Sequence, residues 1–147
     1  MPSRVGFYLA PGQPVERVLP LIARAALGRG QRLLVVAEDG ALLDRIGSAL
    51  WEYAPAEFLA NGRADRPYAA HQPVLLSHAC AAENGARVVA LADGKWREEA
   101  EGFDRALLFF DEDGRAAARD VWRRFDGRED VAREFHELEA GKWVRKR

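Results

Sequence analysis

Short runs of large apolar residues recur along this chain, and longer segments with helical periodicity separate them. Most of the apolar runs lack the in-out alternation of a strand with one wet face, so they are typical of strands buried on both sides. The runs are RVGFYLA (4–10), RLLVVAE (32–38), PVLLS (73–77), RVVALAD (87–93) and RALLFFD (105–111). Between them, VERVLPLIARAALGRG (15–30) and DGALLDRIGSALWEY (39–53) carry apolar residues three and four positions apart. This alternation predicts an α/β fold with a mostly parallel sheet that is flanked by helices on both faces.

The composition places this fold in an ordinary globular protein. Of the 147 residues, 48% are hydrophobic and 31% are charged, so we expect a single α/β domain over residues 1–147. Lysine plus arginine (22) nearly balance aspartate plus glutamate (23), so any binding to a polyanion has to be local. Cys80 has no partner for an internal disulfide, and MPSRVGFYLAPG resembles neither a signal peptide nor a membrane span. We therefore expect a cytoplasmic protein without membrane contact.

Two segments interrupt the regular pattern. Pro20 lies within the first helical segment, where it removes one backbone hydrogen bond, so we expect either a kink there or a late helix start. The stretch ANGRADRPYAAHQP (60–73) is the longest candidate loop.

The first loop lacks the features of a nucleotide site. After the first apolar run comes APGQP, which contains neither GxGxxG nor GxxxxGK[ST], so the glycines that let a backbone approach pyrophosphate are missing. We therefore predict a Rossmann-like sheet without a nucleotide site and without a cofactor. Asp39, after the second run, has two interpretations: a ribose-binding acid or, more plainly, a helix N-cap.

The sequence gives little indication of a metal site or a catalytic site. His71, His78 and Cys80 do not complete a tetrahedral zinc site, and Ser77 beside His78 lacks a GxSxG elbow. The acidic cluster 111–113 follows an apolar run, where a magnesium site is one interpretation; the preferred one is that Asp113 caps the next helix. We expect no metal and no enzyme, with a small nucleotide-dependent enzyme or hydrolase on the same fold as the alternative.

The segment RAAARDVWRRF (115–125) predicts a helix with a basic and aromatic side. Arg115, Arg119, Trp122 and Arg123 are spaced i, i+4, i+7 and i+8, so their side chains share about a quarter of the circumference. One interpretation is a docking surface for an acidic group; the other is a set of solvated arginines around a partly buried Trp122. Direct binding of single-stranded DNA is a third option, against which the near-neutral net charge argues.

A second candidate surface is the aromatic turn LWEYAPAEFLA (50–60). The side chains of Trp51, Tyr53, Phe58 and Leu59 crowd around Pro55 just beyond the second helical segment, in a turn that leads into an expected short strand. Such rings belong either to the core or to a patch that binds a protein partner.

Several of these segments, taken in order, carry a resemblance to a known family. The order FYL, GQRLLVVAED, ALW, PAEFLANG, QPVLLS, LLFFDEDG and ARDVWRRF resembles the chi subunit of the bacterial DNA polymerase III holoenzyme, along nearly the whole chain. The resemblance implies a non-catalytic accessory subunit with a nucleotide-binding type of fold that binds no nucleotide.

The resemblance also implies a function and a site. Chi subunits link the clamp loader, through the psi subunit, to single-stranded DNA-binding protein by gripping the acidic C-terminal tail of that protein during DNA replication, so contact with DNA is indirect. Arg119 matches the arginine central to tail binding, and Arg115 and Arg123 stand where the family can carry lysines. Trp122 matches an aromatic position, and Leu108 matches an apolar wall residue.

Two further expectations follow from the resemblance. Trp51 and Phe58 match aromatic positions that contact psi, with a DNA-repair helicase as the other candidate partner for this patch. The stretch beyond residue 126 departs from the family pattern, and it includes Trp143 and the basic end of GKWVRKR. We expect there either a final edge strand followed by a solvated tail, or a supplementary contact to acidic tails.

Overall fold

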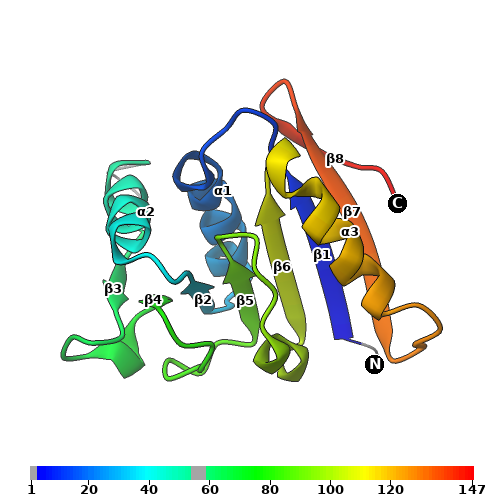
Figure 1. The fold of residues 1–147 in the computed structure, drawn as a ribbon. Helices are drawn as coiled ribbons and strands as arrows, with labels where there is room; N and C mark the ends of the chain where they lie inside the picture. Colours follow the sequence, from blue (N-terminus) through cyan, green and yellow to red (C-terminus); the bar gives the residue numbers. More distant parts are fainter. Residues whose placement is uncertain (1–2, 54–58) are drawn as a thin grey trace.

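The structure is a computed structural model that describes residues 3–53 and 59–147. Within these ranges, eight strands form one sheet in the order β3-β4-β2-β5-β6-β1-β7-β8 (Figure 1). The five apolar runs form parallel strands, as predicted: β1 (Ser3–Leu9), β2 (Leu33–Val36), β4 (Val74–Ser77), β5 (Val88–Leu91) and β6 (Arg105–Phe110). The other strands are β3 (Asn61–Arg63), β7 (Val131–Glu139) and β8 (Lys142–Arg145), and only β8 runs antiparallel to its neighbour in this described sheet.

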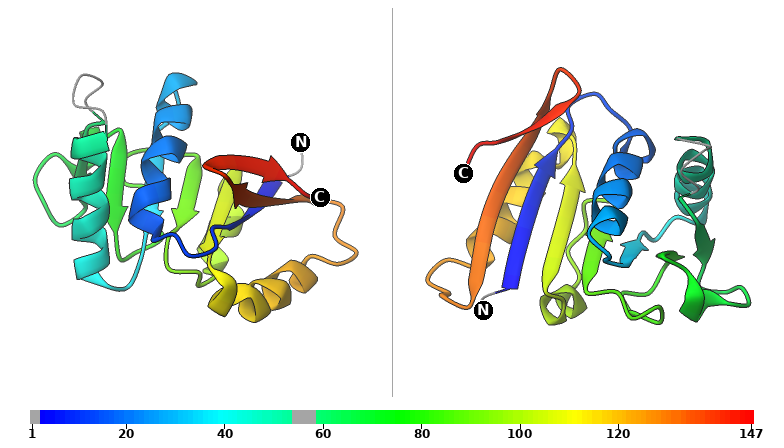
Figure 2. Two further views of the ribbon diagram at one scale, coloured as in Figure 1. Left: turned by 90° about the horizontal axis from the view of Figure 1, so that it is seen from above. Right: turned by 180° about the vertical axis from the view of Figure 1, so that it is seen from behind.

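Helices cover both faces of the sheet. Helices α1 (Val15–Gly28) and α2 (Gly40–Tyr53) lie on one face, and α3 (Arg115–Arg124) lies on the other (Figure 2). The side chains of β1 divide accordingly: Phe7 belongs to the core beneath α3, and Tyr8 to the core beneath α1. The central strands are therefore apolar on both sides, and the predicted Rossmann-like α/β fold is confirmed. In the described part of the chain, no helix is long and apolar enough to cross a membrane.

Helix α1 runs through its proline. It begins at Val15, so the expected late start is wrong, and Pro20 lies inside the helix with a buried side chain. Because proline has no N–H, the carbonyl of Glu16 loses its helical donor at this point. The apolar face of α1 against the sheet compensates for this loss, and the helix continues to Gly28.

The predicted long loop at 60–73 contains regular structure. Strand β3 pairs in parallel with β4 at the edge of the sheet, and the 3-10 turn η1 (Ala69–His71) follows it. The sequence NGR has little intrinsic strand preference, so the pairing with β4 decides its conformation. At Gly62, a Cβ would lie 2.8 Å from the side-chain amide nitrogen of Gln72, so a larger residue there would displace the Gln72 side chain.

The last two strands form a hairpin at the outer side of β1. Strand β7 pairs in parallel with β1, and a two-residue turn at Ala140 and Gly141 leads into β8. Both turn residues have positive φ angles, of 51° and 78°, as a type I′ turn requires. Trp143 packs edge-on against Tyr8, with ring centroids 5.1 Å apart. The expected final edge strand is confirmed.

A buried carboxylate ties β7 to β1. Glu134 is only 6% exposed, accepts a hydrogen bond from Nε of Arg4 at 3.1 Å, and lies 3.0 Å from Nε2 of His136. Burial opposes ionisation of Glu134, but its hydrogen bonds with His136 and Arg4 outweigh this effect and lower its pKa to about 2. This network fixes the start of the hairpin on the sheet.

Candidate functional site

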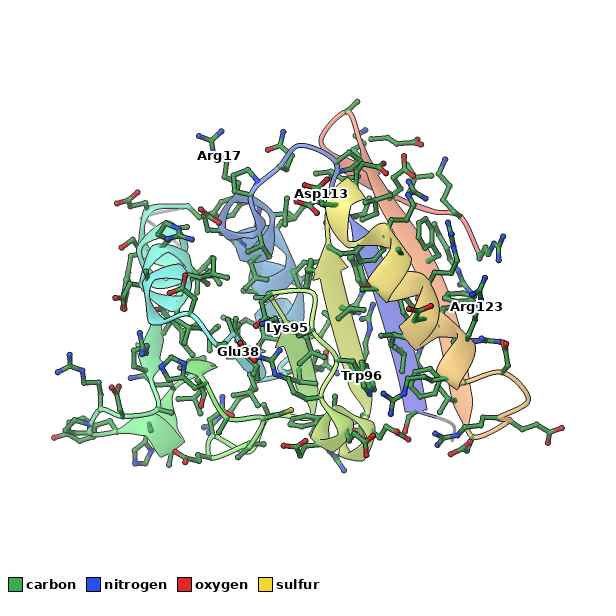
Figure 3. All side chains as sticks on the ribbon, viewed as in Figure 1. Arg17, Glu38, Lys95, Trp96, Asp113 and Arg123 are labelled. Atoms are coloured by element: carbon green, nitrogen blue, oxygen red, sulfur yellow. The ribbon has the colours of Figure 1, made fainter. Side chains whose placement is uncertain are left out.

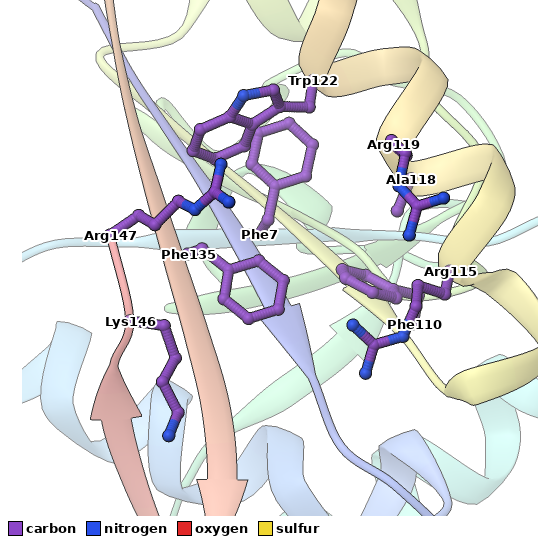
Figure 4. A pocket seen from close by; sticks show the side chains of 9 residues that line it. All are labelled: Phe7, Phe110, Arg115, Ala118, Arg119, Trp122, Phe135, Lys146 and Arg147. Atoms are coloured by element: carbon purple, nitrogen blue, oxygen red, sulfur yellow. The ribbon is translucent and has the colours of Figure 1, made fainter.

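A pocket of about 240 Å³ opens between α3 and the β7–β8 hairpin (Figure 4). We call it the α3 pocket. Strands β1, β6 and β7 supply its aromatic floor, α3 forms one wall, and the residues that follow β8 form the opposite wall. Its lining consists of Phe7, Phe110, Arg115, Ala118, Arg119, Trp122, Phe135, Lys146 and Arg147.

Local sequence explains how α3 begins and which side it turns inward. The Asp111 carboxylate accepts a hydrogen bond from the Gly114 amide at 3.1 Å in the 3-10 turn η3 (Glu112–Gly114), which leads directly into α3. The acidic cluster therefore lies at the start of the helical segment, but Asp111 caps the turn η3, and the prediction that Asp113 caps the helix was wrong, since the N-cap of α3 is Gly114. The small Ala118 packs α3 closely on the sheet, and the long side chains beside it line the pocket.

Aromatic rings form the floor of the α3 pocket. Phe7 contacts Trp122 with ring centroids 5.0 Å apart, and Phe110 lies 6.3 Å from Phe135. The guanidinium of Arg133 lies 4.8 Å from the Trp122 ring centroid and donates to the Trp122 carbonyl at 2.6 Å. Trp122 is consequently half-buried, and it is fixed in place as a rigid apolar surface.

The cations around the α3 pocket differ in whether they are already paired. Arg115 donates two hydrogen bonds of 2.9 Å to Glu112, and this pairing lowers the pKa of Glu112. Lys146 Nζ lies 2.6 Å from Glu139 Oε1. Within residues 3–53 and 59–147, no hydrogen bond or ion pair engages the guanidinium of Arg119 or of Arg147. These two guanidinium groups are therefore available to an external anion.

Most of the predicted helix residues meet at this pocket. Arg115, Arg119 and Trp122 line it, as the spacing on one side of a helix predicted. Arg123 is exposed on α3 (Figure 3) but does not belong to the lining. The assignment of Leu108 as a wall residue is wrong, because its side chain is 0% exposed in the core beneath α3. Phe110, two residues further along the same face of β6, takes that place.

Sequence reasoning missed several lining residues. Phe7, Phe110 and Phe135 lie in strands, and their sequence signal is the same as that of any buried strand residue. Lys146 and Arg147 carried a signal, because the basic run near residue 147 was open to an interpretation as a supplementary contact. Their position beside the pocket depends on the turn that brings β8 back along β7.

The second predicted surface is only partly described. Trp51 lies on α2 with half of its surface (50%) exposed, and Tyr53 is also exposed. Leu59, close by in the chain, is buried. Phe58 lies outside the described residues. The two exposed rings fit the interpretation of this segment as a partner-binding patch better than the interpretation as core.

A second depression, of about 380 Å³, lies at the carboxyl ends of β1, β5 and β6, where enzymes of this architecture hold their substrates. Its Asp93 receives hydrogen bonds from Arg97 and from the amides of Glu38 and Lys95. Burial raises the pKa of Asp93, but these hydrogen bonds outweigh burial and lower it overall. Lys95 in turn lies 2.7 Å from Glu38 Oε2 (Figure 3). The charged groups here thus hold the loops together.

Asp39 and His78, which were considered as possible ligand-binding or catalytic residues, also form contacts within the fold. Asp39 accepts a hydrogen bond from the Ala41 amide at 2.9 Å, which confirms the N-cap interpretation. His78 lies 3.2 Å from the Ala37 carbonyl and 3.1 Å from a guanidinium nitrogen of Arg63. In the portion of the chain that the structure describes, no three metal-ligating side chains lie close enough to hold an ion.

Fold and site together define a class: a Rossmann-like α/β protein with a basic, aromatic-lined pocket between its last helix and its C-terminal hairpin. The chain belongs to the chi subunit family of DNA polymerase III, because the family model described as DNA polymerase III chi subunit, HolC, matches residues 1–130. It is therefore a member of a family of accessory subunits in DNA replication. No curated protein matches the chain.

Proposed function

We propose that this protein is a non-catalytic chi subunit that links the clamp loader of DNA polymerase III to single-stranded DNA-binding protein, by binding the acidic C-terminal tail of the latter in the α3 pocket. The observation that carries the proposal is the guanidinium of Arg119, which has no ion-pair partner among the described residues and lies beside an aromatic depression. A tail of this kind ends in an apolar side chain next to a free carboxylate, and this pocket offers a complementary group for each.

The chemistry favours a terminal carboxylate over an isolated anion. A guanidinium donates two parallel hydrogen bonds to a carboxylate, and Arg119 has no internal acid that competes for them within the described residues. The floor beside it consists of Phe7, Phe110 and Phe135, which provide apolar contact for the last side chain of the tail. Arg115 lines the pocket beside Arg119, but its pair with Glu112 offsets its charge, so Arg119 is the main cation of this wall.

The pocket is small, so we expect modest affinity from a single tail. A volume of about 240 Å³ accommodates roughly one large side chain with its carboxylate, and the remainder of a tail lies on the exposed rim. Exposed charges are screened by salt, so binding weakens as the ionic strength rises. Several tails on one single-stranded DNA-binding protein compensate through multivalency.

For the second surface, we propose that Trp51 and Phe58 bind the psi subunit, or a repair helicase that uses the same patch. The half-exposed ring of Trp51 on α2 supports an anchor of this kind. Helix α2 and the α3 pocket lie on opposite faces of the sheet, so one partner at each surface is sterically compatible with the other.

A titration of a labelled peptide that copies the acidic tail of the organism's own single-stranded DNA-binding protein, followed by fluorescence anisotropy, tests the proposal. The Arg119→Ala variant should bind about 5-fold to 150-fold more weakly, the range for losing a charge-assisted hydrogen bond of ~1 to 3 kcal/mol. Arg17→Ala is the control, since it removes the same charge from an exposed position on α1, on the opposite face of the sheet from the α3 pocket.

The same assay separates the alternatives. A peptide with a C-terminal amide should bind poorly, because the carboxylate is the proposed ligand of Arg119. A labelled single-stranded oligonucleotide in place of the peptide tests direct DNA binding, which predicts tight binding that Arg119→Ala and Arg123→Ala weaken equally. Equal affinity of wild-type protein and Arg119→Ala for the tail peptide would place the site elsewhere.

A further inference from the structure

The guanidinium groups of Arg119 and Arg147, which are unpaired in the part of the chain that the structure describes, lie on opposite walls of the α3 pocket. Arg119 projects from α3, and Arg147 approaches from the residues that follow β8, on the other side of the aromatic floor (Figure 4). Phe135 and Phe7 lie between them in the same view. In the described chain, neither guanidinium has an acidic partner, whereas their neighbours Arg115 and Lys146 are paired with Glu112 and Glu139. A ligand with two anionic groups would satisfy both of these cations.

The position of Arg147 is fixed by backbone hydrogen bonds. The Lys146 amide donates to the Phe135 carbonyl at 2.7 Å, and the Phe135 amide lies 3.4 Å from the Arg147 carbonyl. Arg145 donates from Nε to that same carbonyl at 2.8 Å. The antiparallel pairing of β7 with β8 thus extends to the floor of the pocket, and Arg147 is held at its edge by the main chain.

The β7–β8 hairpin is also anchored independently of any ligand. Trp143 packs against Tyr8 on the opposite face of the sheet, with Phe109 at a centroid distance of 6.4 Å. The buried Glu134 holds the beginning of β7 on Arg4 of β1. The wall that carries Arg147 is therefore preorganised, so that little ordering entropy is lost when an anion binds there.

We propose that the β7–β8 hairpin supplies a second anion receptor, in which Arg147 binds a side-chain carboxylate of an acidic peptide whose terminal carboxylate is bound by Arg119. This inference rests on the proposed function of the α3 pocket. It concerns a segment that lies outside residues 1–130, over which the chain matches its family. The hairpin thus selects for acidic residues upstream of the end of the peptide, and Arg119 selects for the end itself.

The size of the pocket and the pairing of its cations support separate receptors for the terminal carboxylate and for a side-chain carboxylate. The pocket holds roughly one apolar side chain with its carboxylate, so the preceding residues of a peptide must cross the rim. On the α3 side, Arg115 is already bound to Glu112 through both of its hydrogen bonds. On the hairpin side, the only lining cation without an ion pair in the described residues is Arg147. A side-chain carboxylate on the rim therefore finds its unpaired donor there.

Three peptides and three variants test the inference by anisotropy titration. The peptides are an acidic tail with a free C-terminus, the same tail with every aspartate changed to asparagine, and the acidic tail with a C-terminal amide. The variants are Arg147→Ala, Arg119→Ala and Lys142→Ala. Lys142 is the matched control, because it is an exposed cation of the same hairpin that does not line the pocket.

We expect Arg147→Ala to weaken binding of the acidic tail about 3-fold to 30-fold, and to change binding of the asparagine peptide less than about 2-fold. Arg119→Ala should retain its effect with the asparagine peptide and lose it with the amidated one. Lys142→Ala should change binding of the acidic tail less than about 2-fold. The side chain of Arg147 is exposed and its backbone hydrogen bonds survive truncation, so the variant should fold normally.

The possible failures are distinguishable. If wild-type protein binds the acidic tail but Arg147→Ala behaves like Lys142→Ala, the hairpin receptor is refuted and the proposed function stands. If the effect of Arg147→Ala is the same for the acidic and the asparagine peptide, Arg147 does not recognise side-chain carboxylates, and the inference also fails. If the wild-type protein binds none of the peptides, the proposed function itself is wrong.

Discussion

Changing Glu134 to glutamine should destabilise the protein in a pH-dependent manner. The buried carboxylate accepts from Arg4 and contacts His136, and these hydrogen bonds outweigh burial to lower its pKa from 4.5 to about 2. A pKa lowered by this much corresponds to ~3 kcal/mol of folding stability, at about 1.4 kcal/mol per pKa unit. Because the Arg4 side chain is 54% exposed, solvent screening reduces this figure, and we expect about 2 kcal/mol at pH 7.

The sign of the pH dependence follows from the lowered pKa. A carboxyl group that ionises more readily in the folded state than in the unfolded state stabilises the fold fully above the unfolded value of 4.5. The contribution is then lost as the pH falls from 4.5 towards 2. Glutamine resembles the protonated acid, so the difference between wild type and Glu134→Gln should drop below half by about pH 3 and approach zero near pH 2.

Urea unfolding followed by circular dichroism at pH 7, 5, 4 and 3 measures this difference. Glu129→Gln serves as a control, because it removes an exposed carboxylate just before β7 and should change the free energy of unfolding by less than about 0.5 kcal/mol. A difference between wild type and Glu134→Gln that is constant from pH 7 to pH 3 would refute the reasoning, since it would mean that loss of the ionised form is not the cause.

Three further changes test the described packing. Ala140→Asn should raise the free energy of unfolding by roughly 0.5 to 1 kcal/mol in urea titrations, because Asn-Gly suits the two positive φ angles of the β7–β8 turn better than alanine does. Gly6→Ala should lower it by roughly 1 to 3 kcal/mol, because a Cβ there would lie 2.5 Å from the Tyr8 ring. Trp122→Ala should lower the melting temperature through loss of its contacts with Phe7 and Arg133, and should also weaken binding of the tail peptide, which calorimetry measures.

The fold was largely predictable because its signals are local. The strands β1, β2, β4, β5 and β6 are continuous apolar runs, and the helices carry apolar residues three and four apart, so each segment indicates its own conformation. A short strand was expected after the aromatic turn, but the residues of β3 were assigned to the loop 60–73, since three residues at a sheet edge have too little pattern and depend on β4 for their pairing. The late start expected for α1 was wrong because burial of its apolar face outweighs the hydrogen bond lost at Pro20.

The candidate site was predictable only along α3. Arg115, Arg119 and Trp122 share one side of a helix, and this depends on sequence spacing alone. Leu108 and Phe110 point to the same face of β6, and the sequence does not distinguish the buried one from the one that reaches the pocket. Their exposure depends on where α3 ends over the sheet, which is a property of the packed structure.

The sequence by itself determined the alternation of strands and helices, the absence of a glycine-rich phosphate loop, and the basic side of α3. These properties depend on residues that are close together in the chain, so spacing and backbone geometry are sufficient to predict them. Only the tertiary structure decided that Phe7, Phe110 and Phe135 form one floor, and that Arg119 and Arg147 remain unpaired in the described chain while Arg115 does not. Phe7 and Phe135 meet because β7 returns beside β1, and long-range pairing of this kind depends on the packing of the whole sheet.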